Sequence, residues 1–320
     1  MQRAVVEGVG HYLPKRVVEN SEFETTLETN DAWIRSRTGI ERRHFADEHE
    51  TTAFMGAEAA KAALAYADCT IDKVDAILVA TSTADLTFPS VATMIQNRLG
   101  MRHGFAFDLQ AVCAGFVYAL TVANAMIASG QNSRILVIGS ETFSKLMDWT
   151  DRSTCVLFGD GAGAMLIGAE PDDNATRGIL STTLHSDGKY KDLLYVDGGV
   201  SLQTTGYLRM QGKEIFRHAV EKLSEATFEA LEKAGLATED VDWIVPHQAN
   251  KRILEGMSKR LNIPAERVIM TVNNHGNTSA ASIPLAMSVS LNENRIKPGD
   301  LVVIGAIGGG LAWGTAVIRW

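Results

Sequence analysis

Cysteine is scarce in this chain of 320 residues, which holds only Cys69, Cys113 and Cys155. Such a sparse and odd set excludes a disulfide framework and is typical of proteins in a reducing cytoplasm. The chain also lacks any run of the roughly 20 apolar residues that a membrane helix needs. Its first residues contain no apolar core of a secretory signal. We therefore expect a cytoplasmic protein that does not bind membranes.

Positive charge is also in short supply. Lys and Arg total 30 against 38 Asp and Glu, which gives a formal net charge of −8. A nucleic-acid-binding protein usually presents an excess of positive charge, so the composition argues against nucleic acid as a partner. Hydrophobic residues make up 46% of the chain and charged residues 21%. These proportions are ordinary for a globular protein and exclude a disordered or fibrous chain.

Short β-branched runs alternate with longer helical patterns along the chain. The predicted buried strands are Val74–Ala80, Ile135–Gly139, Trp243–Val245 and Leu301–Gly305. Alternation of strands and helices predicts an α/β protein in which the strands are mostly parallel.

The two halves of the chain resemble each other. The sequence RILVIG at residues 134–139 returns as DLVVIG at 300–305, and other landmarks recur at nearly the same offset. A repeated set of landmarks indicates an internal duplication. The polar stretch at 169–178 falls between the copies. We therefore predict an N-terminal half of residues 1–172 and a C-terminal half of residues 173–320.

Cys113 lies where the predicted strand FAFDL gives way to a small-residue helical run that starts near Ala111. Unsatisfied N–H groups and the positive end of the helix dipole favour a thiolate at such a position. Cys113 is therefore a candidate nucleophile. A buried structural role stays open, because cysteine is among the most buried residue types.

A histidine and an asparagine are the candidate partners of this cysteine. His247 follows a predicted strand, at the edge where α/β sheets bind ligands. Asn277 lies 164 residues after Cys113, in the sequence HGNTSAASIP. We predict that Cys113 and Asn277 occupy the same place in the two halves and that His247 converges with them on one cleft. A structural role for His247 and a helix N-cap role for Asn277 stay open.

Two glycine-rich stretches invite comparison with nucleotide-binding motifs. GAIGGGLAWG at residues 305–314 can offer backbone N–H groups as an oxyanion hole, and no Lys-Ser/Thr follows it as a phosphate loop would require. GDGAGA at 159–164 leads into a strand where a dinucleotide motif needs a helix, so we interpret it as a packed turn. The histidines and cysteines show no ligand spacing, and we predict no metal site.

Six motifs together resemble the thiolase-fold condensing enzymes, and most closely the β-ketoacyl-acyl-carrier-protein synthase III family. They are DAWIRSRTGI at 31–40, AVCAGF at 111–116, DRSTCVLFGDGAGA at 151–164, VPHQANKRI at 245–253, HGNTSAASIP at 275–284 and GGGLAWG at 308–314. The resemblance implies a thiolase-like fold, with internally duplicated α/β halves packed as a layered αβαβα sandwich. It also implies a homodimer that needs no cofactor beyond its coenzyme A thioester substrate.

The activity implied by the resemblance is that of an acyltransferase. Such an enzyme condenses an acyl-CoA primer, here acetyl-CoA, with malonyl-acyl carrier protein and so initiates fatty-acid synthesis. Cys113 would take the acyl group, while His247 and Asn277 bind the thioester carbonyl of the malonyl group. Backbone N–H groups of Cys113 and Gly309 would form the oxyanion hole.

The resemblance also implies binding roles for residues around these groups. Those for coenzyme A are Trp33, Arg37 and Arg152; those for the acyl pocket are Phe88, Phe143 and Ile307; those for carrier-protein docking are Arg217, Arg252, Lys259 and Arg260. Ile307 stands where the family usually has Phe, and Phe143 stands where an aliphatic residue is more usual. Phe88 corresponds to a residue that reaches the acyl pocket of the partner subunit.

Three alternatives stay open. A relative that condenses medium-chain acyl-CoA, or that makes a secondary metabolite, would share every catalytic residue. The chain order Cys, His, Asn also describes papain-like hydrolases, although that interpretation predicts a secretory signal or disulfides. A binding module without catalytic activity is disfavoured because all three residues are present.

Overall fold

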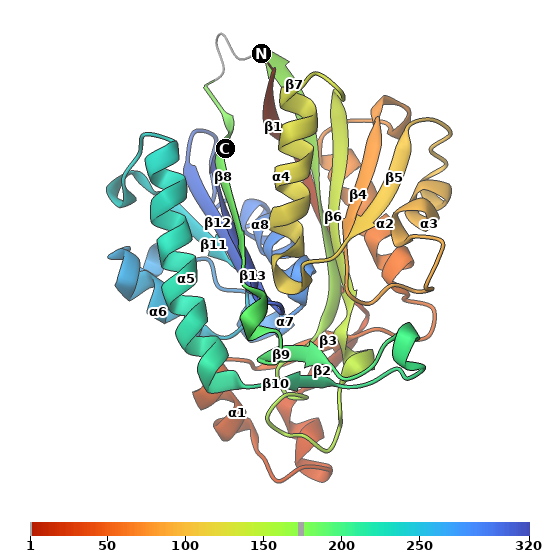
Figure 1. The fold of residues 1–320 in the computed structure, drawn as a ribbon, viewed down its shortest axis with the longest axis vertical. Coiled ribbons are helices and arrows are strands. Elements are labelled where there is room, and N and C mark those ends of the chain that lie inside the picture. Colours follow the sequence, from red (N-terminus) through yellow and green to blue (C-terminus); the bar gives the residue numbers. More distant parts are fainter. Residues whose placement is uncertain (1, 172–175) are drawn as a thin grey trace.

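The computed structural model describes residues 2–171 and 176–320. Two β-sheets form its centre, with helices between and outside them (Figure 1). In spatial order, the first sheet consists of β1 (Gln2–Tyr12), β7 (Asp160–Pro171), β6 (Arg134–Thr142), β4 (Ala76–Ala80) and β5 (Phe105–Leu109). The second consists of β11 (Trp243–Pro246), β12 (Leu301–Gly308), β13 (Ala312–Arg319) and β8 (Gly178–Ser186). The small pairs are β2 (Arg16–Glu19) with β3 (Arg42–Phe45), and β9 (Leu194–Val196) with β10 (Leu208–Met210).

The two sheets repeat one strand order. The series β1, β7, β6, β4 in the first sheet corresponds to β8, β13, β12, β11 in the second. This correspondence confirms the predicted internal duplication. The expectation of mostly parallel strands is confirmed, because β1, β6, β4 and β5 run in one direction in the first sheet, and β11, β12 and β8 do so in the second. The exceptions are β7 and β13, which follow β6 and β12 with no crossover α-helix between them and pair antiparallel with both of their neighbours.

The helices complete a five-layer αβαβα arrangement, as predicted (Figure 1). The α-helices are α1 (Asp31–Thr38), α2 (Thr52–Tyr66), α3 (Val91–Leu99), α4 (Gly115–Ala128), α5 (Gly212–Lys233), α6 (Lys251–Leu261), α7 (Val272–His275) and α8 (Ser282–Asn292). Helices α2 and α3 cover the outer face of the first sheet, and α5 and α6 cover the outer face of the second. Helices α4 and α8 lie between the sheets, in one apolar core with residues from both.

Glycine in the first sheet allows helix α8 of the central layer to approach it closely. A Cβ atom at Gly163 of β7 would lie 2.4 Å from the backbone N of Leu285 in α8, so only glycine fits there. This contact corrects the interpretation of GDGAGA as a turn. Strand β7 already begins at Asp160, and its glycines let α8 approach the sheet.

The gap in the described residues falls between the two sheets in sequence. Every strand of the first sheet precedes residue 172, and every strand of the second follows residue 175. The predicted boundary between residues 172 and 173 lies outside the described residues. Within the described ranges, no helix combines the length and the apolar character needed to cross a bilayer.

Candidate active site

Cys113 sits on a 3-10 turn, η3 (Val112–Ala114), that joins strand β5 to helix α4. The helix begins at Gly115 rather than near Ala111 as predicted. Val112 has a φ of 48°, which is costly for a β-branched residue. The strained turn holds Cys113 at the start of the helix, as a nucleophile at a strand-to-helix elbow would be held.

The surroundings of Cys113 do not favour the thiolate that its place before a helix led us to expect. The side chain is buried, with 4% of its surface exposed. Burial raises the pKa of the Cys113 thiol to about 12, the negative charge of Glu141 adds to the rise, and the Ser279 hydroxyl opposes it. Apolar surroundings therefore outweigh the helix terminus, and the resting group is the neutral thiol.

The glycine triplet at the end of β12 lies against the backbone of this turn. A Cβ atom at Gly308 would lie 2.7 Å from the backbone N of Cys113, so the close approach requires glycine. Gly309 follows in the turn that leads to β13, and a Cβ there would meet the carbonyl oxygen of Leu194 at 2.6 Å. The predicted oxyanion-hole residues Cys113 and Gly309 are thus on two segments in direct contact.

His247 follows β11 and is buried as a neutral imidazole. Burial lowers its pKa to about 3. Its Nδ1 lies 2.7 Å from Oγ of Ser282, the first residue of α8. Because that hydroxyl accepts a hydrogen bond from the backbone N–H of Gln248, we assign its own proton to a hydrogen bond with Nδ1. The proton of His247 then resides on Nε2, the nitrogen left to donate to a ligand.

Asn277 is fixed from both sides. Its backbone N–H donates to Leu157 at 2.9 Å, and its carbonyl accepts from the N–H of Gly159 at 3.0 Å. Its Oδ1 accepts from the backbone N–H of Ser279 at 2.9 Å, so the Nδ2 amide group is the part left to donate to a ligand. Asn277 is not the N-cap of α8, which is Ala281.

The predicted equivalence of Cys113 and Asn277 is wrong. Helix α4 begins at Gly115 and α8 at Ser282, 167 residues later, and each follows a 3-10 turn. By that offset the counterpart of Cys113 is Ala280, at the centre of the turn η10 (Ser279–Ala281). Asn277 lies three residues earlier, on the loop that leads into this turn.

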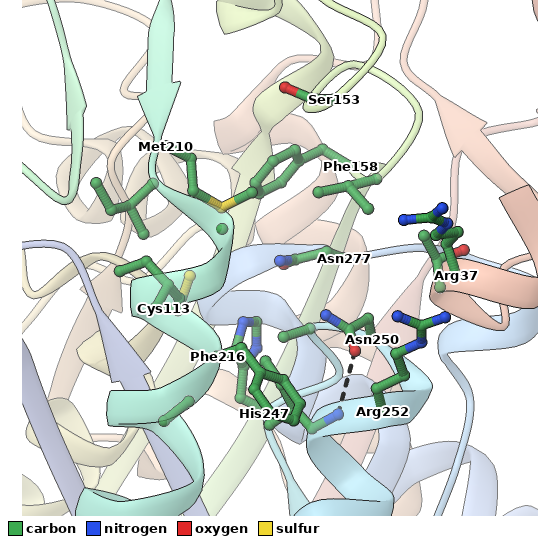
Figure 2. A pocket seen from close by; sticks show the side chains of 18 of the residues that line it. Arg37, Cys113, Ser153, Phe158, Met210, Phe216, His247, Asn250, Arg252 and Asn277 are labelled. Carbon is green, nitrogen blue, oxygen red and sulfur yellow. Dashed lines mark hydrogen bonds between the residues drawn. The ribbon is translucent and has the colours of Figure 1, made fainter. Parts of the chain in front are cut away.

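Cys113, His247 and Asn277 nevertheless line one cavity of about 570 Å³. Phe143 and Ile307, predicted for the acyl pocket, line it as well. Figure 2 shows Cys113 on one side of the cavity, with the Asn277 amide pointing toward it and His247 beside both. A thiol nucleophile and two hydrogen-bond donors therefore face the same buried space.

Cationic and aromatic side chains surround the mouth of this cavity. Arg37 and Arg252 lie together on the side opposite Cys113 (Figure 2). The guanidinium groups of Arg37 and Arg152 each lie 5.3 Å from the ring of Trp33, and Arg152 also donates to the carbonyl of Glu28. Arg152 thus contacts the indole directly, and both are residues to which the resemblance gives a role in binding coenzyme A.

Other predicted residues lie outside the cavity. Phe88 is 81% exposed on the loop before α3 and does not line this cavity. Arg217 pairs with Glu214 at 2.6 Å, and Arg260 lies 3.5 Å from Glu225, while Lys259 is exposed on α6. Of the four predicted docking residues, Arg252 alone lines the mouth.

Several lining residues were missed by the sequence analysis. Phe158 stacks on Phe143 with ring centroids 5.2 Å apart, and Met210 and Phe216 close the same space (Figure 2). Asn250 caps α6 through Oδ1 at 3.1 Å from the N–H of Ile253, which leaves its amide nitrogen at the cavity. The N-cap position before LysArgIleLeu was the available signal for Asn250. Residues 2–171 and 176–320 contain no cluster of three or more metal-binding side chains.

Comparison with known proteins gives consistent matches over the whole chain. Models of 3-oxoacyl-[acyl-carrier-protein (ACP)] synthase III match residues 107–188 and, for its C-terminal part, residues 231–320. A curated relative from Ruegeria sp. (strain TM1040), a beta-ketoacyl-[acyl-carrier-protein] synthase III, is 67% identical over 321 residues, covering 100% of this chain and 99% of the relative.

Solved structures match equally completely. The 3-oxoacyl-[acyl-carrier-protein] synthase III from Aquifex aeolicus VF5 has a TM-score of 0.94 and 44% identity, covering 99% of this chain and 100% of its own. The priming beta-ketosynthase of the R1128 polyketide biosynthetic pathway has a TM-score of 0.94 and 35% identity, covering 99% and 97%. The predicted thiolase-like fold is confirmed by these neighbours.

Proposed function

This chain belongs to the 3-oxoacyl-[acyl-carrier-protein] synthase III family, and on that premise we propose that Cys113, His247 and Asn277 join an acyl-CoA primer to malonyl-acyl carrier protein. The product is a 3-oxoacyl-acyl carrier protein, and the reaction initiates fatty-acid synthesis. The chain is thus an acyltransferase of the condensing type.

In the first half of the reaction, Sγ of Cys113 attacks the thioester carbonyl of acyl-CoA. Coenzyme A leaves and the acyl group stays on the sulfur. The backbone N–H groups of Cys113 and Gly309 stabilise the negative charge on the carbonyl oxygen. Trp33, Arg37 and Arg152 bind coenzyme A at the mouth, where Arg152 must leave the indole face for the adenine to stack.

In the second half, malonyl-acyl carrier protein replaces coenzyme A. Nε2–H of His247 and the amide of Asn277 donate to the malonyl thioester oxygen and stabilise the enolate that forms as carbon dioxide leaves. The enolate carbon attacks the acyl carbon, and Cys113 leaves as a thiolate. Ile307 and Phe143 border the acyl chain, while Arg252, with Arg217, Lys259 and Arg260 further along, attracts the acidic carrier protein.

We further propose a cytoplasmic homodimer that needs no resident cofactor. The support for the dimer is a groove next to the cavity, lined partly by exposed apolar residues such as Leu86 and Val200. Phe88 is exposed on the same loop as Leu86 and would reach the partner's acyl pocket.

The observation that carries the proposal is the convergence of Cys113, His247 and Asn277 on one buried cavity. It is tested by intact-protein mass spectrometry after incubation with acetyl-, butyryl- or octanoyl-CoA, with Cys113→Ser as the control. We expect one acyl adduct on the wild type alone, and most adduct with acetyl-CoA. The absence of an adduct from every donor, or an equal adduct on Cys113→Ser, would reject the assignment of the nucleophile.

A further inference from the structure

A buried carboxyl group that the steps above do not use lies near Cys113. Glu141, near the end of β6, has no exposed surface. Its Oε2 accepts three hydrogen bonds from the segment after β4: from Thr81 Oγ1 at 3.2 Å, Ser82 N at 3.0 Å and Thr83 Oγ1 at 2.5 Å. Its Oε1 is equally buried but has no hydrogen-bond partner among the described residues. One side of this carboxyl is therefore firmly held and the other is unpaired.

The hydroxyl of Ser279 is a second unpaired group at the same place. Ser279 opens the turn η10, has a φ of 49° and is fully buried, and its Oγ makes no hydrogen bond within the part of the chain that the structure describes. Turn η10 packs against η3, which carries Cys113. The same turn also packs against β6, which carries Glu141, so Ser279 stands between the segment of the thiol and the strand of the carboxyl.

Leaving two buried polar atoms unpaired costs about 1–3 kcal/mol for each. Unsatisfied buried groups of this kind call for an explanation, and a proton-transfer role supplies one. A hydroxyl can accept a proton on one side while it donates its own on the other. A short proton relay needs a donor, a group that passes the proton on and an acceptor, and these can be Cys113, Ser279 and Glu141.

We propose that Ser279 and Glu141 form a relay that receives the proton of Cys113 when the thiol is acylated. The Sγ–H proton passes to Oγ of Ser279 while the Ser279 hydroxyl proton passes to Oε1 of Glu141. Sγ then bonds to the acyl carbon, the bond to the sulfur of coenzyme A breaks, and that thiolate takes a proton from solvent. When condensation releases Cys113 as a thiolate, the stored proton returns by the same route.

Glu141 suits this task better than His247. Burial raises the pKa of Glu141 to about 7, whereas that of His247 is lowered to about 3. A general base is most effective when its pKa is near the working pH. Hydrogen bonds to Oε2 from Thr83, Ser82 and Thr81 oppose this rise in the pKa of Glu141.

The charge of the relay also explains why a single proton moves. Cys113, on η3, is a titratable neighbour of Glu141, and the ionised carboxyl raises the pKa of the thiol by repulsion. Two negative charges in this space are therefore unfavourable. Transfer of one proton moves a single negative charge from the carboxylate to the sulfur and leaves the total unchanged.

The test measures single-turnover acylation by acetyl-CoA between pH 5.5 and 9, followed by rapid-quench mass spectrometry. In the wild type the rate should rise as pH passes about 7, because only the ionised carboxylate accepts a proton. Glu141→Gln, which cannot accept one, should slow acylation about 100-fold and lose the inflection. Ser279→Ala should behave like Glu141→Gln, and Glu141→Asp should keep an inflection at reduced rate.

Thr83→Val is the matched control, because it removes a hydroxyl from the held oxygen of the same carboxyl. Loss of that hydrogen bond to the ionised form should move the inflection to higher pH without abolishing it. Decarboxylation of malonyl-acyl carrier protein, which uses His247 and Asn277, reports whether each variant is folded. If Glu141→Gln does not fold, Ser279→Ala and Glu141→Asp decide.

The relay would be overturned by a folded Glu141→Gln or Ser279→Ala that keeps the wild-type pH profile, even at a lower rate. Loss of the inflection in Glu141→Asp would overturn it equally. The inference rests on the proposed function, and the two fail differently. A wild type that no acyl-CoA acylates refutes the proposed function, whereas normal acylation with an unchanged profile in the variants refutes the relay alone.

Discussion

The turns η3 and η10 hold corresponding positions in the duplicated fold but differ in chemistry. Each precedes a helix of the central layer, and neither helix has a side-chain N-cap. η3 carries Cys113 at its centre, whereas η10 carries Ala280. In the second half, the functional side chains stand on either side of that alanine, at Asn277, Ser279 and Ser282. The duplicated fold thus contains two equivalent strand-to-helix elbows, η3 and η10. The nucleophile lies on the first, and Asn277, Ser279 and Ser282 lie on or beside the second.

The second elbow, centred on Ala280, is closely packed against the first half of the chain. A Cβ atom at Gly139 of β6 would lie 2.3 Å from the carbonyl oxygen of Ala280. The methyl group of Ala280 lies 3.7 Å from the position that a Cβ at Gly115 would take. The turn η10 is therefore packed closely against β6 and α4, with Ala280 buried between them. It acts as a packed support behind the turn that carries the nucleophile.

The largest effect is expected from removing the hydrogen-bond donors His247 and Asn277 of the C-terminal half. His247→Ala and Asn277→Ala should each lower condensation about 100- to 1000-fold, because the enolate loses a donor. Both should leave acylation of Cys113 within a few-fold of wild type. Condensation is measured with labelled malonyl-acyl carrier protein, and acylation by intact mass. Loss of acylation in both variants would contradict the separation of roles between the halves.

The next effect comes from disturbing the backbone of the first elbow. Gly308→Ala would bring a methyl group 2.7 Å from the Cys113 nitrogen and 2.8 Å from the Ala111 oxygen. We expect a loss of about 1–3 kcal/mol in the free energy of unfolding, together with slower acylation. Gly188→Ala is the control, because nothing lies within 4 Å of its Cβ position. Equal denaturation curves for the two variants would show that the backbone of the turn η3 leaves room for a methyl group at Gly308.

A smaller effect is expected from loss of the hydrogen bond between Ser282 and His247. Ser282→Ala removes the partner of His247 Nδ1 at 2.7 Å. The freed imidazole can adopt the other tautomer, so kcat for condensation should fall about 10-fold, equivalent to about 1.4 kcal/mol. Ser290→Ala, on the same helix, is the control, because its buried hydroxyl has no partner within the described ranges. Identical kcat values for the two variants would refute the positioning role of Ser282.

On acidification, Glu141 and His275 should have opposite effects on the stability of the fold. His275 lies two residues before Asn277. Burial lowers the pKa of His275 to about 3. Below pH 6.5 the unfolded chain therefore binds a proton that the folded chain does not, and the free energy of unfolding decreases as the pH is lowered. Glu141, with its pKa raised to about 7 from 4.5, has the opposite effect between those values.

Relative to wild type, His275→Gln should therefore lose less stability from pH 6.5 to 5.5, and Glu141→Gln should lose more. Each difference should be on the order of 1 kcal/mol per pH unit. Guanidinium unfolding at the two pH values measures it. A change of the same sign in both variants would be inconsistent with the stated protonation states.

The smallest effect is expected from Arg252, at the mouth of the cavity, rather than from the buried groups within it. Arg252→Glu should raise KM for malonyl-acyl carrier protein about 5-fold and spare kcat, because a charge at the mouth acts mainly on association. Lys297→Glu makes the same charge change before β12, at the end of the sheet away from the cavity, and should have no effect. Steady-state kinetics at low and high salt measure the difference. Equal KM values would remove Arg252 from the docking surface.

The sequence predicted the layers and the residues that share the cavity because periodicity and motif order carry that information. It could not locate the start of α4, since the residues of the 3-10 turn have the same small, apolar character as those of the helix. It misaligned Asn277 with Cys113 because the halves differ by a few residues in loop length. The neutral state of Cys113 also escaped prediction, because burial depends on residues far away in sequence. The hydrogen bond from Ser282 to His247 spans 35 residues and leaves no local signal.

The shared central layer has a consequence for the history of the fold. Phe116 and Val117 of α4 belong to the same apolar core as Ile283 and Met287 of α8, and each helix is covered by the other half of the chain. A polypeptide with a single copy would expose one whole face of its own helix to water. Such an ancestor required a second copy of itself, related by a twofold axis, to cover that face. What is now the middle of one chain is best understood as an ancient subunit interface that gene fusion made permanent.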